Sequence, residues 1–263
     1  MDTHTDKEQQ MATNDPTPRT AVVTGASRGF GRASVTELVA HGVGVIGVAR
    51  HADPLDQLRD ELGERFLPVV GDATDAELAR KLIEEHQPGI LILNAGATPD
   101  MGSLREHTWE SFSRNWDVDT QHAFHWTREA LRLPLAPGSV VLAVSSGAAL
   151  RGSPLSGGYA GAKAGVRFIS AYAAEESRRD GLQIRFTALL PQLTPATDLG
   201  ATGVAAYAAY EGLDVDTFVE RFQPILSPQH VGKAVIELTT DPEPDTAQHL
   251  AYLLTGAGLQ PLD

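Results

Sequence analysis

The sequence predicts an α/β fold, in which a doubly wound, largely parallel sheet of about seven strands carries helices on both faces. Short apolar runs alternate with longer helical stretches from Thr20 onwards. Most of these runs are continuously apolar, as expected for strands that are covered on both sides. A glycine-rich turn also lies between the first run and the first helical stretch. A chain of 263 residues can build one such domain with a full core.

The expected elements follow in order along the chain. Seven apolar runs are predicted as strands, at residues 20–25, 43–49, 66–71, 89–96, 139–146, 183–191 and 250–256. Three stretches are predicted as crossover helices and two longer ones as further helices, at residues 31–41, 53–63, 74–86, 108–132 and 159–179. Asp75 or Thr74 has a side chain suited to cap the third helix. No repeat or linker divides the chain, so residues 20–263 are expected to form a single domain.

Residues 1–19, "MDTHTDKEQQMATNDPTPR", are polar and end in a proline-containing turn, which is typical of a disordered arm. They hold no apolar run that could serve as the core of a signal peptide. No later stretch approaches the roughly 18 uninterrupted apolar residues of a membrane span. A cytoplasmic protein is therefore expected.

The composition narrows the range of partners and chemistries. The formal net charge of −13 repels phosphate backbones and anionic lipid surfaces, which argues against nucleic acid and membrane partners. The absence of cysteine excludes disulfides, thiolate catalysis and cysteine-ligated metals. His122 and His125 are three residues apart, but no acidic third ligand stands at a zinc-site spacing. Both are expected on a helix surface, and no metal is assigned.

The first expected strand runs directly into "TGASRGFG", residues 24–31, and then into a helix. Gly25, Gly29 and Gly31 allow the backbone to turn tightly and to approach a pyrophosphate. The free N–H groups and the dipole at the helix N-terminus favour such an anion. Because the turn lies between a predicted strand and a predicted helix, we expect a nucleotide site here, to which Ser27 and Phe30 of the same turn also contribute.

Several landmarks occur in a fixed order along this pattern. Three residues separate the first two glycines of the turn, and Tyr159 and Lys163 stand four apart in "YAGAK". "GDATD" follows the third expected strand, "NAG" follows the fourth, and Ser146 precedes Tyr159 by thirteen residues. In these respects the chain resembles the classical short-chain dehydrogenase/reductase family over nearly its whole length after residue 19. The resemblance implies a Rossmann-type fold and an oxidoreductase that uses a nicotinamide cofactor.

The charge at the end of the second expected strand bears on which cofactor is bound. NAD enzymes place a carboxylate there to hold the ribose hydroxyls, whereas a carboxylate would repel the 2′-phosphate of NADP. This chain has Ala49-Arg50, and a second cation, Arg28, lies inside the glycine turn. Two guanidiniums can hold a 2′-phosphate by charge-assisted hydrogen bonds, which favours NADP(H) over NAD(H). The alternative is that both arginines are ordinary surface residues.

The resemblance implies further cofactor contacts. Asp72 would hold the adenine amino group, with the main-chain N–H of Ala73 beside it, although Asp72 could instead be a helix cap. Three residues would line the adenosine ribose: Asn94, Ala95 and Gly96. After the sixth expected strand, Pro191 and Thr194 would approach the nicotinamide, and Thr197 is a weaker candidate.

Tyr159 and Lys163 lie on one helix face, so their side chains can converge on one pocket. A phenol has an ordinary pKa of about 10, and a neighbouring ammonium lowers it toward the working pH. Lys163 can also bind the nicotinamide ribose. Ser146 would polarise the substrate oxygen while Tyr159 transfers the proton that accompanies the hydride. The expected function is an NADPH-dependent ketoreductase that transfers a hydride between the nicotinamide and a carbonyl or secondary alcohol.

Two positions depart from the family pattern. Asp119 stands where the family commonly has an asparagine whose main-chain carbonyl holds a water. A carboxylate near Lys163 would shift the catalytic pKa upward; the alternative is a helix-surface aspartate without effect. Gln192 stands where the family usually has glycine after Pro191, which alters the carboxamide pocket or the substrate pocket beside it. These departures give some support to a first alternative, a nucleotide-binding regulator without redox chemistry. A second alternative is a lyase or cyclase that keeps the tyrosine as an acid/base but transfers no hydride.

The substrate-selecting regions of the family match residues 147–158 and 197–222 here. Four aromatic residues could form an apolar lid or simply pack it onto the core: Tyr207, Tyr210, Phe218 and Phe222. Arg151 could meet an acidic substrate group or remain solvated. The substrate is a small molecule that the sequence does not define further. By resemblance, the helices at 108–132 and 159–179 pair between subunits, which implies a homodimer or, in preference, a homotetramer.

Overall fold

A computed structural model describes residues 20–240 and 248–262 of the chain. Its centre is one eight-stranded sheet in the order β3-β2-β1-β4-β5-β6-β7-β8. The strands are β1 Thr20–Thr24, β2 Gly44–Ala49, β3 Phe66–Val70, β4 Ile90–Leu93, β5 Val140–Val144, β6 Arg185–Pro191, β7 Ala251–Thr255 and β8 Gly258–Leu262. All neighbouring strands pair in parallel except β7 and β8, which are antiparallel. The expected Rossmann-type α/β architecture is confirmed.

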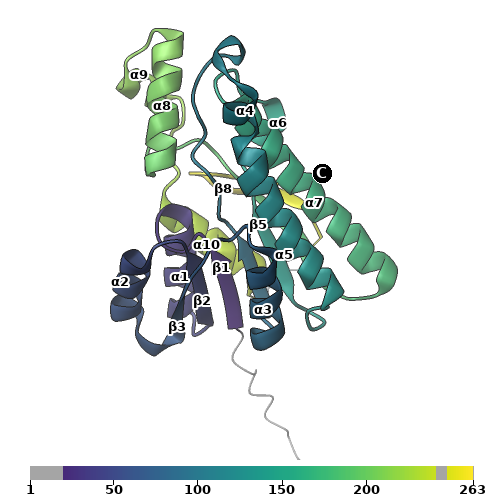
Figure 1. Cartoon of the computed structure of the whole chain (residues 1–263). Coiled ribbons are helices and arrows are strands. Elements are labelled where there is room, and N and C mark those ends of the chain that lie inside the picture. The colour runs from purple at the N-terminus through teal and green to yellow at the C-terminus, as the bar shows by residue number, and fades with distance from the viewer. Residues whose placement is uncertain (1–19, 241–247, 263) are drawn as a thin grey trace, which may run out of the picture.

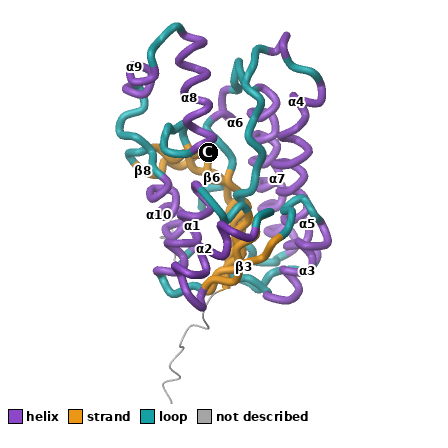
Figure 2. The backbone as a smooth tube through the Cα atoms, turned by 60° about the vertical axis from the view of Figure 1, so that its left-hand side comes forward, coloured by secondary structure: helices purple, strands orange, loops and turns teal. Residues whose placement is uncertain are grey.

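Helices cover both faces of this sheet (Figures 1 and 2). They are α1 Gly29–Ala40, α2 Ala52–Leu62, α3 Ala76–His86, α4 Trp109–Asn115, α5 Gln121–Arg132, α6 Ala148–Arg151, α7 Gly157–Asp180, α8 Asp198–Glu211, α9 Val215–Glu220 and α10 Pro228–Thr239. One hydrophobic core lies between the sheet and α1, α2 and α10, and a second lies between the sheet and α3, α5 and α7. Continuously apolar strands result because each central strand faces both cores.

The predicted strands all form, and the eighth strand is the one the sequence pattern missed. Its sequence, "GLQPL", contains Gln260 and Pro261 and lacks an apolar run. It can still pair because it is an edge strand and Pro261 needs no hydrogen bond on the open side. The helix α10 was also not predicted. The expected arm at residues 1–19 lies outside the described residues.

The helix predicted at residues 108–132 is interrupted. The chain forms α4, then a π-helical turn over Trp116–Thr120, and then α5. Such a turn carries one extra residue inside an otherwise regular helix. The interruption rotates the residues before it relative to those after it, which matters for Asp119 below.

The carboxyl ends of β1, β4, β5 and β6 meet along one edge of the sheet, because these neighbouring strands are parallel. The loops that follow them carry the glycine turn, the "NAG" segment, Ser146 and Gln192. Helices α8 and α9 stand beyond this same edge (Figure 1). This is the position at which open α/β sheets bind ligands. Within the described residues, no helix is long and apolar enough to cross a membrane.

Candidate active site

A large cleft of about 1650 Å³ runs along the carboxyl edge of the sheet. Every residue that the sequence singled out as a site residue borders it, with one exception. The exception is Gly31, which is buried below the turn. The sequence therefore located the lining of the cleft correctly, from the glycine turn at one end to Tyr159 and Pro191 at the other.

The glycine turn needs its glycines for two different reasons. Gly25 and Gly29 have φ angles of 67° and 53°, in the left-handed region that side chains other than glycine rarely adopt. Gly31 has an ordinary backbone, but a Cβ there would collide with the carbonyl oxygen of Gly25 and the side-chain amide of Asn94. The turn is thus packed directly onto the "NAG" segment, and the amide of Asn94 donates to the carbonyl oxygens of Thr24 and Gly25 at 3.1 and 3.2 Å.

A buried hydroxyl beneath the turn connects three segments. The Thr24 Oγ1 accepts hydrogen bonds from the main-chain N–H groups of Asn94 and Ala95 at 3.0 and 3.2 Å, and it lies 2.9 Å from His122 Nε2. His122 is 2% exposed, so the expectation of a surface histidine is wrong. Burial, together with the nearby Lys163 charge, lowers the pKa of His122 to about 3. The sequence carried a signal for this burial, because the fully buried Trp126 stands one helical turn further on.

His125 is half-buried, with its Nδ1 enclosed and unpaired. The expectation of a surface residue is therefore only partly right for His125. Among the described residues, no three His, Asp or Glu side chains stand together in a way that could hold a metal ion.

The end of the cleft at the glycine turn, called the outer end below, carries charges of both signs. Asp72 Oδ1 accepts hydrogen bonds from the main-chain N–H and the hydroxyl of Thr74, at 2.9 and 2.8 Å, and these bonds hold the pKa of Asp72 below its usual value. Asp75, not Asp72, caps α3 by accepting from the N–H of Glu77. Arg50 lies near enough to contribute to the lowered pKa of Asp72. The outer end thus keeps an exposed cation beside an exposed carboxylate.

Arg28 is exposed at the rim and contacts Asp198 of α8 at 3.5 Å. Both side chains remain largely in water, with exposed fractions of 72% and 87%. The guanidinium is therefore accessible from the cleft that Arg28 borders.

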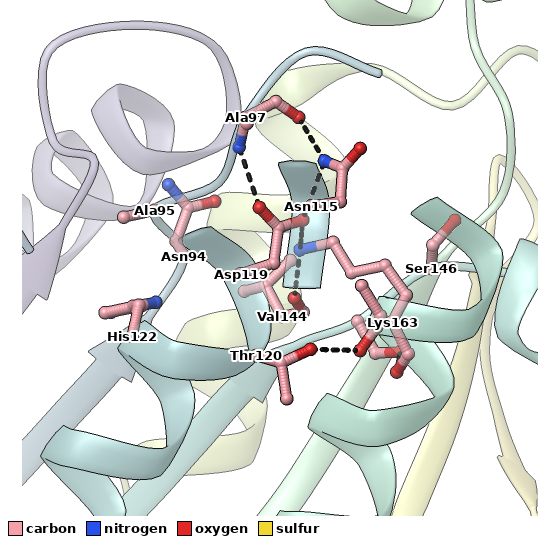
Figure 3. Close-up of polar contacts among 12 residues, drawn as sticks. Asn94, Ala95, Ala97, Asn115, Asp119, Thr120, His122, Val144, Ser146 and Lys163 are labelled. Carbon is pink, nitrogen blue, oxygen red and sulfur yellow. Dashed lines mark hydrogen bonds and ion pairs between the residues drawn. The ribbon is translucent and has the colours of Figure 1, made fainter. Parts of the chain in front are cut away.

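Helix α7 brings Tyr159 and Lys163 to the opposite end of the cleft, called the inner end below (Figure 3 shows Lys163). Lys163 is buried, and its Nζ donates to the Val144 carbonyl oxygen at 3.1 Å and pairs with Asp119 Oδ2 at 3.4 Å. The ammonium lies 5.8 Å from the centre of the Tyr159 ring. The hydroxyl of Ser145 donates to the Lys163 carbonyl oxygen at 2.7 Å, which fastens this turn of α7 to the end of β5. The expected convergence of the two side chains is present.

Asp119 belongs to the π-helical turn and is 1% exposed, so the alternative of a surface aspartate is wrong. Its Oδ1 accepts from the N–H of Ala97 at 2.7 Å, and its Oδ2 faces Lys163 and the amide of Asn115 (Figure 3). The Asn115 amide also donates to the Ala97 carbonyl oxygen at 2.8 Å. Asn115 was not singled out from the sequence, which does not show that Asn115 and Asp119 both bind the main chain of Ala97, the residue directly after the "NAG" segment.

The sequence predicts that Lys163 lowers the pKa of Tyr159 toward the working pH, but in the structure the pKa of Tyr159 is raised. Burial raises the pKa of Tyr159 above its usual value, and Lys163 and a hydrogen bond with Ser146 oppose this rise without cancelling it. Asp119 adds to the rise. For Lys163, burial acts to lower the pKa, but attraction to Asp119 and then to Tyr159 outweighs it and holds the pKa above its usual value. In the protein as it stands, the phenol is protonated and the amine is charged at neutral pH.

The loops after β5 and β6 complete the inner end. Ser146 is half-buried, and its Oγ accepts from the N–H of Ala148 at 3.2 Å. Gln192 borders the cleft, and its main-chain N–H donates to the Leu254 carbonyl oxygen at 2.8 Å. The Thr194 hydroxyl donates to the carbonyl oxygen of Leu226, so the proton of this hydroxyl already has a partner within the protein. Thr197 caps α8 by accepting from Gly200.

The four lid aromatics divide between the two expected roles. Phe218 is buried at 4% exposure, stacks parallel to Tyr207 and packs against Phe222. These three rings border the cleft, whereas Tyr210 is 62% exposed and does not. The exposed Arg151 also borders the cleft.

Comparisons with known proteins agree with this geometry. A family model described as short chain dehydrogenase matches residues 19–207. The chain is 33% identical over 178 residues to an uncharacterized short-chain type dehydrogenase/reductase of Sinorhizobium fredii, a match that covers 66% of this chain and 32% of that longer protein. It is 29% identical to the NADPH-dependent pterin aldehyde reductase of Arabidopsis thaliana over 167 residues, which is 60% of this chain and 69% of the relative.

A solved structure has the same fold. It is a 3-ketoacyl-(acyl-carrier-protein) reductase from Brucella melitensis complexed with NADH, with a TM-score of 0.75 and 22% identity over 90% of this chain and 97% of that one. Because the family match runs from the first strand through the helix with Tyr159 and Lys163 and into the lid, the chain belongs to the short-chain dehydrogenase family.

Proposed function

We propose that this protein is an NADP(H)-dependent oxidoreductase that acts as a ketoreductase, with residues 20–263 as a single catalytic domain. The observation that carries the proposal is the grouping of Ser146, Tyr159 and a charged, buried Lys163 at the inner end of a cleft whose other end is a glycine turn. A protein that only bound a nucleotide would need the turn and not the phenol.

The residues present fit a nicotinamide dinucleotide. No side chain makes a capping hydrogen bond at the N-terminus of α1, which leaves its main-chain N–H groups available to a pyrophosphate. Arg28 and Arg50 are exposed cations at the end where a 2′-phosphate would lie, and this supports NADP(H) over NAD(H). Asp72 and Ala73 would hold the adenine, while Asn94, Ala95 and Gly96 would border its ribose.

When bound, the reduced cofactor supplies the hydride that reaches the carbonyl carbon. Tyr159 holds the proton for the carbonyl oxygen, because burial keeps its pKa above the usual value and the phenol protonated. The Ser146 hydroxyl, which also hydrogen-bonds to Tyr159, would orient and polarise the same oxygen. The Lys163 charge stabilises the phenolate that remains after proton transfer.

Asp119 acts on this chemistry through Lys163. Its carboxylate engages the ammonium at 3.4 Å and raises the pKa of Tyr159. A phenol with a raised pKa is a weaker acid but is protonated over a wider pH range. This arrangement favours reduction of a carbonyl over oxidation of an alcohol, which requires the phenolate.

The contacts of Lys163 also favour one rival function. Its Nζ is held by Asp119 and by the Val144 carbonyl oxygen, so these partners compete with a cofactor ribose for the ammonium. A nucleotide-binding regulator without hydride transfer would tolerate that competition. The lyase or cyclase alternative has no such observation in its favour.

The decisive experiment follows NADPH absorbance with a panel of ketones and aldehydes, for the starting protein, Tyr159→Phe and Tyr172→Phe. Tyr172 lies on the same helix and is 68% exposed, so it controls for loss of a phenol from α7. We expect turnover that Tyr159→Phe lowers by at least about 100-fold and Tyr172→Phe leaves unchanged. Tight NADPH binding without turnover of any carbonyl would favour the regulator instead.

The cofactor preference has a separate test. We expect Arg28→Ala and Arg50→Ala each to lower kcat/KM for NADPH by about tenfold and to leave that for NADH nearly unchanged, because one charge-assisted contact to the 2′-phosphate is lost. Equal losses with both cofactors would reject these arginines as the phosphate ligands.

We also propose a homotetramer or homodimer. Large apolar residues are exposed on α4, the π-helical turn, α5 and α7, at Trp109, Trp116, Phe124, Phe168 and Tyr172. Burial of such a surface between subunits would remove it from water. Light scattering coupled to size-exclusion chromatography would show a mass at least twice the 28.0 kDa chain, and a monomer would refute the proposal.

A further inference from the structure

The lid, residues 197–222, is built as a small unit of its own. Val204, Ala208 and Phe218 are buried within it and pack with Tyr207 and Phe222, separately from the two cores of the sheet. Figure 1 shows α8 and α9 standing beyond the sheet edge, opposite α4 and α6. The position of the lid above the cleft therefore depends on a few contacts with the remainder of the protein.

Two polar side-chain contacts join α8 to described residues outside the lid. One is the pair of Asp198 with Arg28, which is 3.5 Å long and surrounded by water. An exposed pair of this kind contributes little. The other is a short hydrogen bond between the hydroxyls of Tyr207 and Ser153.

The partner of Tyr207 is firmly fixed. Ser153 Oγ accepts from the main-chain N–H of Ser156 at 2.8 Å and lies 2.8 Å from the Ser156 hydroxyl. Ser153 Oγ also accepts from the main-chain N–H of Leu155 at 3.3 Å, so its two lone pairs are occupied and its one proton remains for the hydroxyls of Ser156 and Tyr207. Ser156 directly precedes α7, and Tyr159 lies in the first turn of that helix. The bond thus runs from the lid to the start of the helix that holds Tyr159.

Tyr207 borders the cleft in addition to contacting Ser153. Its ring is parallel to that of Phe218, with 6.3 Å between centres, and both residues border the cleft. Tyr207 is also close enough to Tyr159 to be among the minor causes of its raised pKa. A substrate oxygen at Tyr159 would therefore place the neighbouring group of the substrate against an aromatic wall.

We propose that the Tyr207–Ser153 hydrogen bond is a latch that fixes the lid above Tyr159, and that Tyr207 thereby selects carbonyl substrates with a compact, uncharged, apolar group. The inference deepens the proposed function and rests on it. With the latch formed, a compact group fits between the lid and Tyr159. A bulky group requires the latch to open, so such a substrate binds more weakly because the hydrogen bond between Tyr207 and Ser153 must break.

The latch itself is tested without turnover, by hydrogen exchange of residues 198–222 in the cofactor-free full-length chain. Tyr207→Phe removes the hydroxyl and keeps the ring on Phe218, while Tyr210→Phe changes an exposed tyrosine of the same helix. We expect exchange about fivefold faster in Tyr207→Phe, the effect of losing one hydrogen bond, at least as fast in Ser153→Ala, which also loses the bonds to the N–H groups of Leu155 and Ser156, and unchanged in Tyr210→Phe. Ser153→Thr keeps a hydroxyl and should restore slow exchange. Unchanged exchange in Tyr207→Phe overturns the latch.

Selection is tested with carbonyl compounds of increasing size. Tyr207→Phe should raise KM about fivefold for the smallest compounds, with little change in kcat, and should leave bulky compounds unaffected or improved. The Kd for NADPH should stay the same. Equal losses for all sizes would reject the role of Tyr207 in selection. A protein that reduces no carbonyl defeats the proposed function, whereas the exchange experiment still decides the latch.

Discussion

Two ion pairs border the same cleft and have nearly the same length, but their surroundings are opposite. Lys163 and Asp119 are 3.4 Å apart with exposed fractions of 7% and 0%, whereas Arg28 and Asp198 are 3.5 Å apart with fractions of 72% and 87%. Water screens the second pair and leaves its members free to exchange partners. Water cannot replace either partner of the buried pair, so Asp119 keeps the Lys163 ammonium charged and in place. Burial, not distance, therefore separates a structural ion pair from one that can receive a ligand.

The two pairs should differ most in their contribution to the free energy of unfolding, which is measured by replacing the cation of each pair. Lys163→Met leaves the Asp119 carboxylate buried without its cation, which should lower the free energy of unfolding by about 3–5 kcal/mol. Arg28→Met leaves Asp198 in water and should change it by less than about 1 kcal/mol. Urea denaturation at pH 7 measures both. Similar losses in the two variants would contradict the distinction between the pairs.

A fall in pH should lower the free energy of unfolding through the buried His122. Its folded pKa, about 3, lies below the ordinary 6.5, so the neutral imidazole contributes stability that is present above pH 6.5 and is lost as the pH falls toward 3. At pH 4.5 the loss should reach roughly 2–3 kcal/mol. His122→Gln should lose less stability between pH 7 and pH 4.5 than the starting protein does. The exposed His51 at the outer end provides the control, since His51→Gln should keep the original pH dependence.

A smaller effect is expected when the buried pair keeps its cation and loses its anion. Asp119→Asn preserves the size of the side chain and removes a charge that raises the pKa of Tyr159. The apparent pKa in the pH–rate profile should fall by about one unit, equivalent to about 1.4 kcal/mol. Asp117→Asn, an exposed neighbour in the same turn, should leave the profile in place. An unmoved profile in Asp119→Asn would show that the carboxylate does not act on the phenol.

The smallest effect concerns the exposed pair. Asp198→Asn frees Arg28 for a 2′-phosphate and should strengthen NADPH binding about twofold at low salt. The difference should vanish at about 0.5 M salt, where exposed charges are screened. Fluorescence titration of NADPH at both salt concentrations measures this. A gain that persists at high salt would mean that Asp198 acts by something other than its charge.

The sequence was sufficient for seven of the eight strands, and all but one of the site residues it singled out border the cleft, because apolar runs and short motifs are local signals. The resemblance offered a contact between Asp119 and Lys163 as one alternative, but the sequence did not predict the π-helical turn that carries Asp119, because no local pattern marks such a turn. The burial of His122 was within reach, because it shares a helix face with Trp126. The bond between Ser153 and Tyr207 joins residues 54 positions apart in the chain, and only the tertiary structure brings them together.

The π-helical turn at Trp116–Thr120 has an evolutionary consequence. A turn with one extra residue can arise by a single-codon insertion and can vanish by a single-codon deletion, because the helix on either side keeps its register with the sheet. Deletion within this segment would leave α5 packed as before while withdrawing Asp119 from Lys163. The folding of the domain and the tuning of its acid group could thus change independently in descendants of this chain.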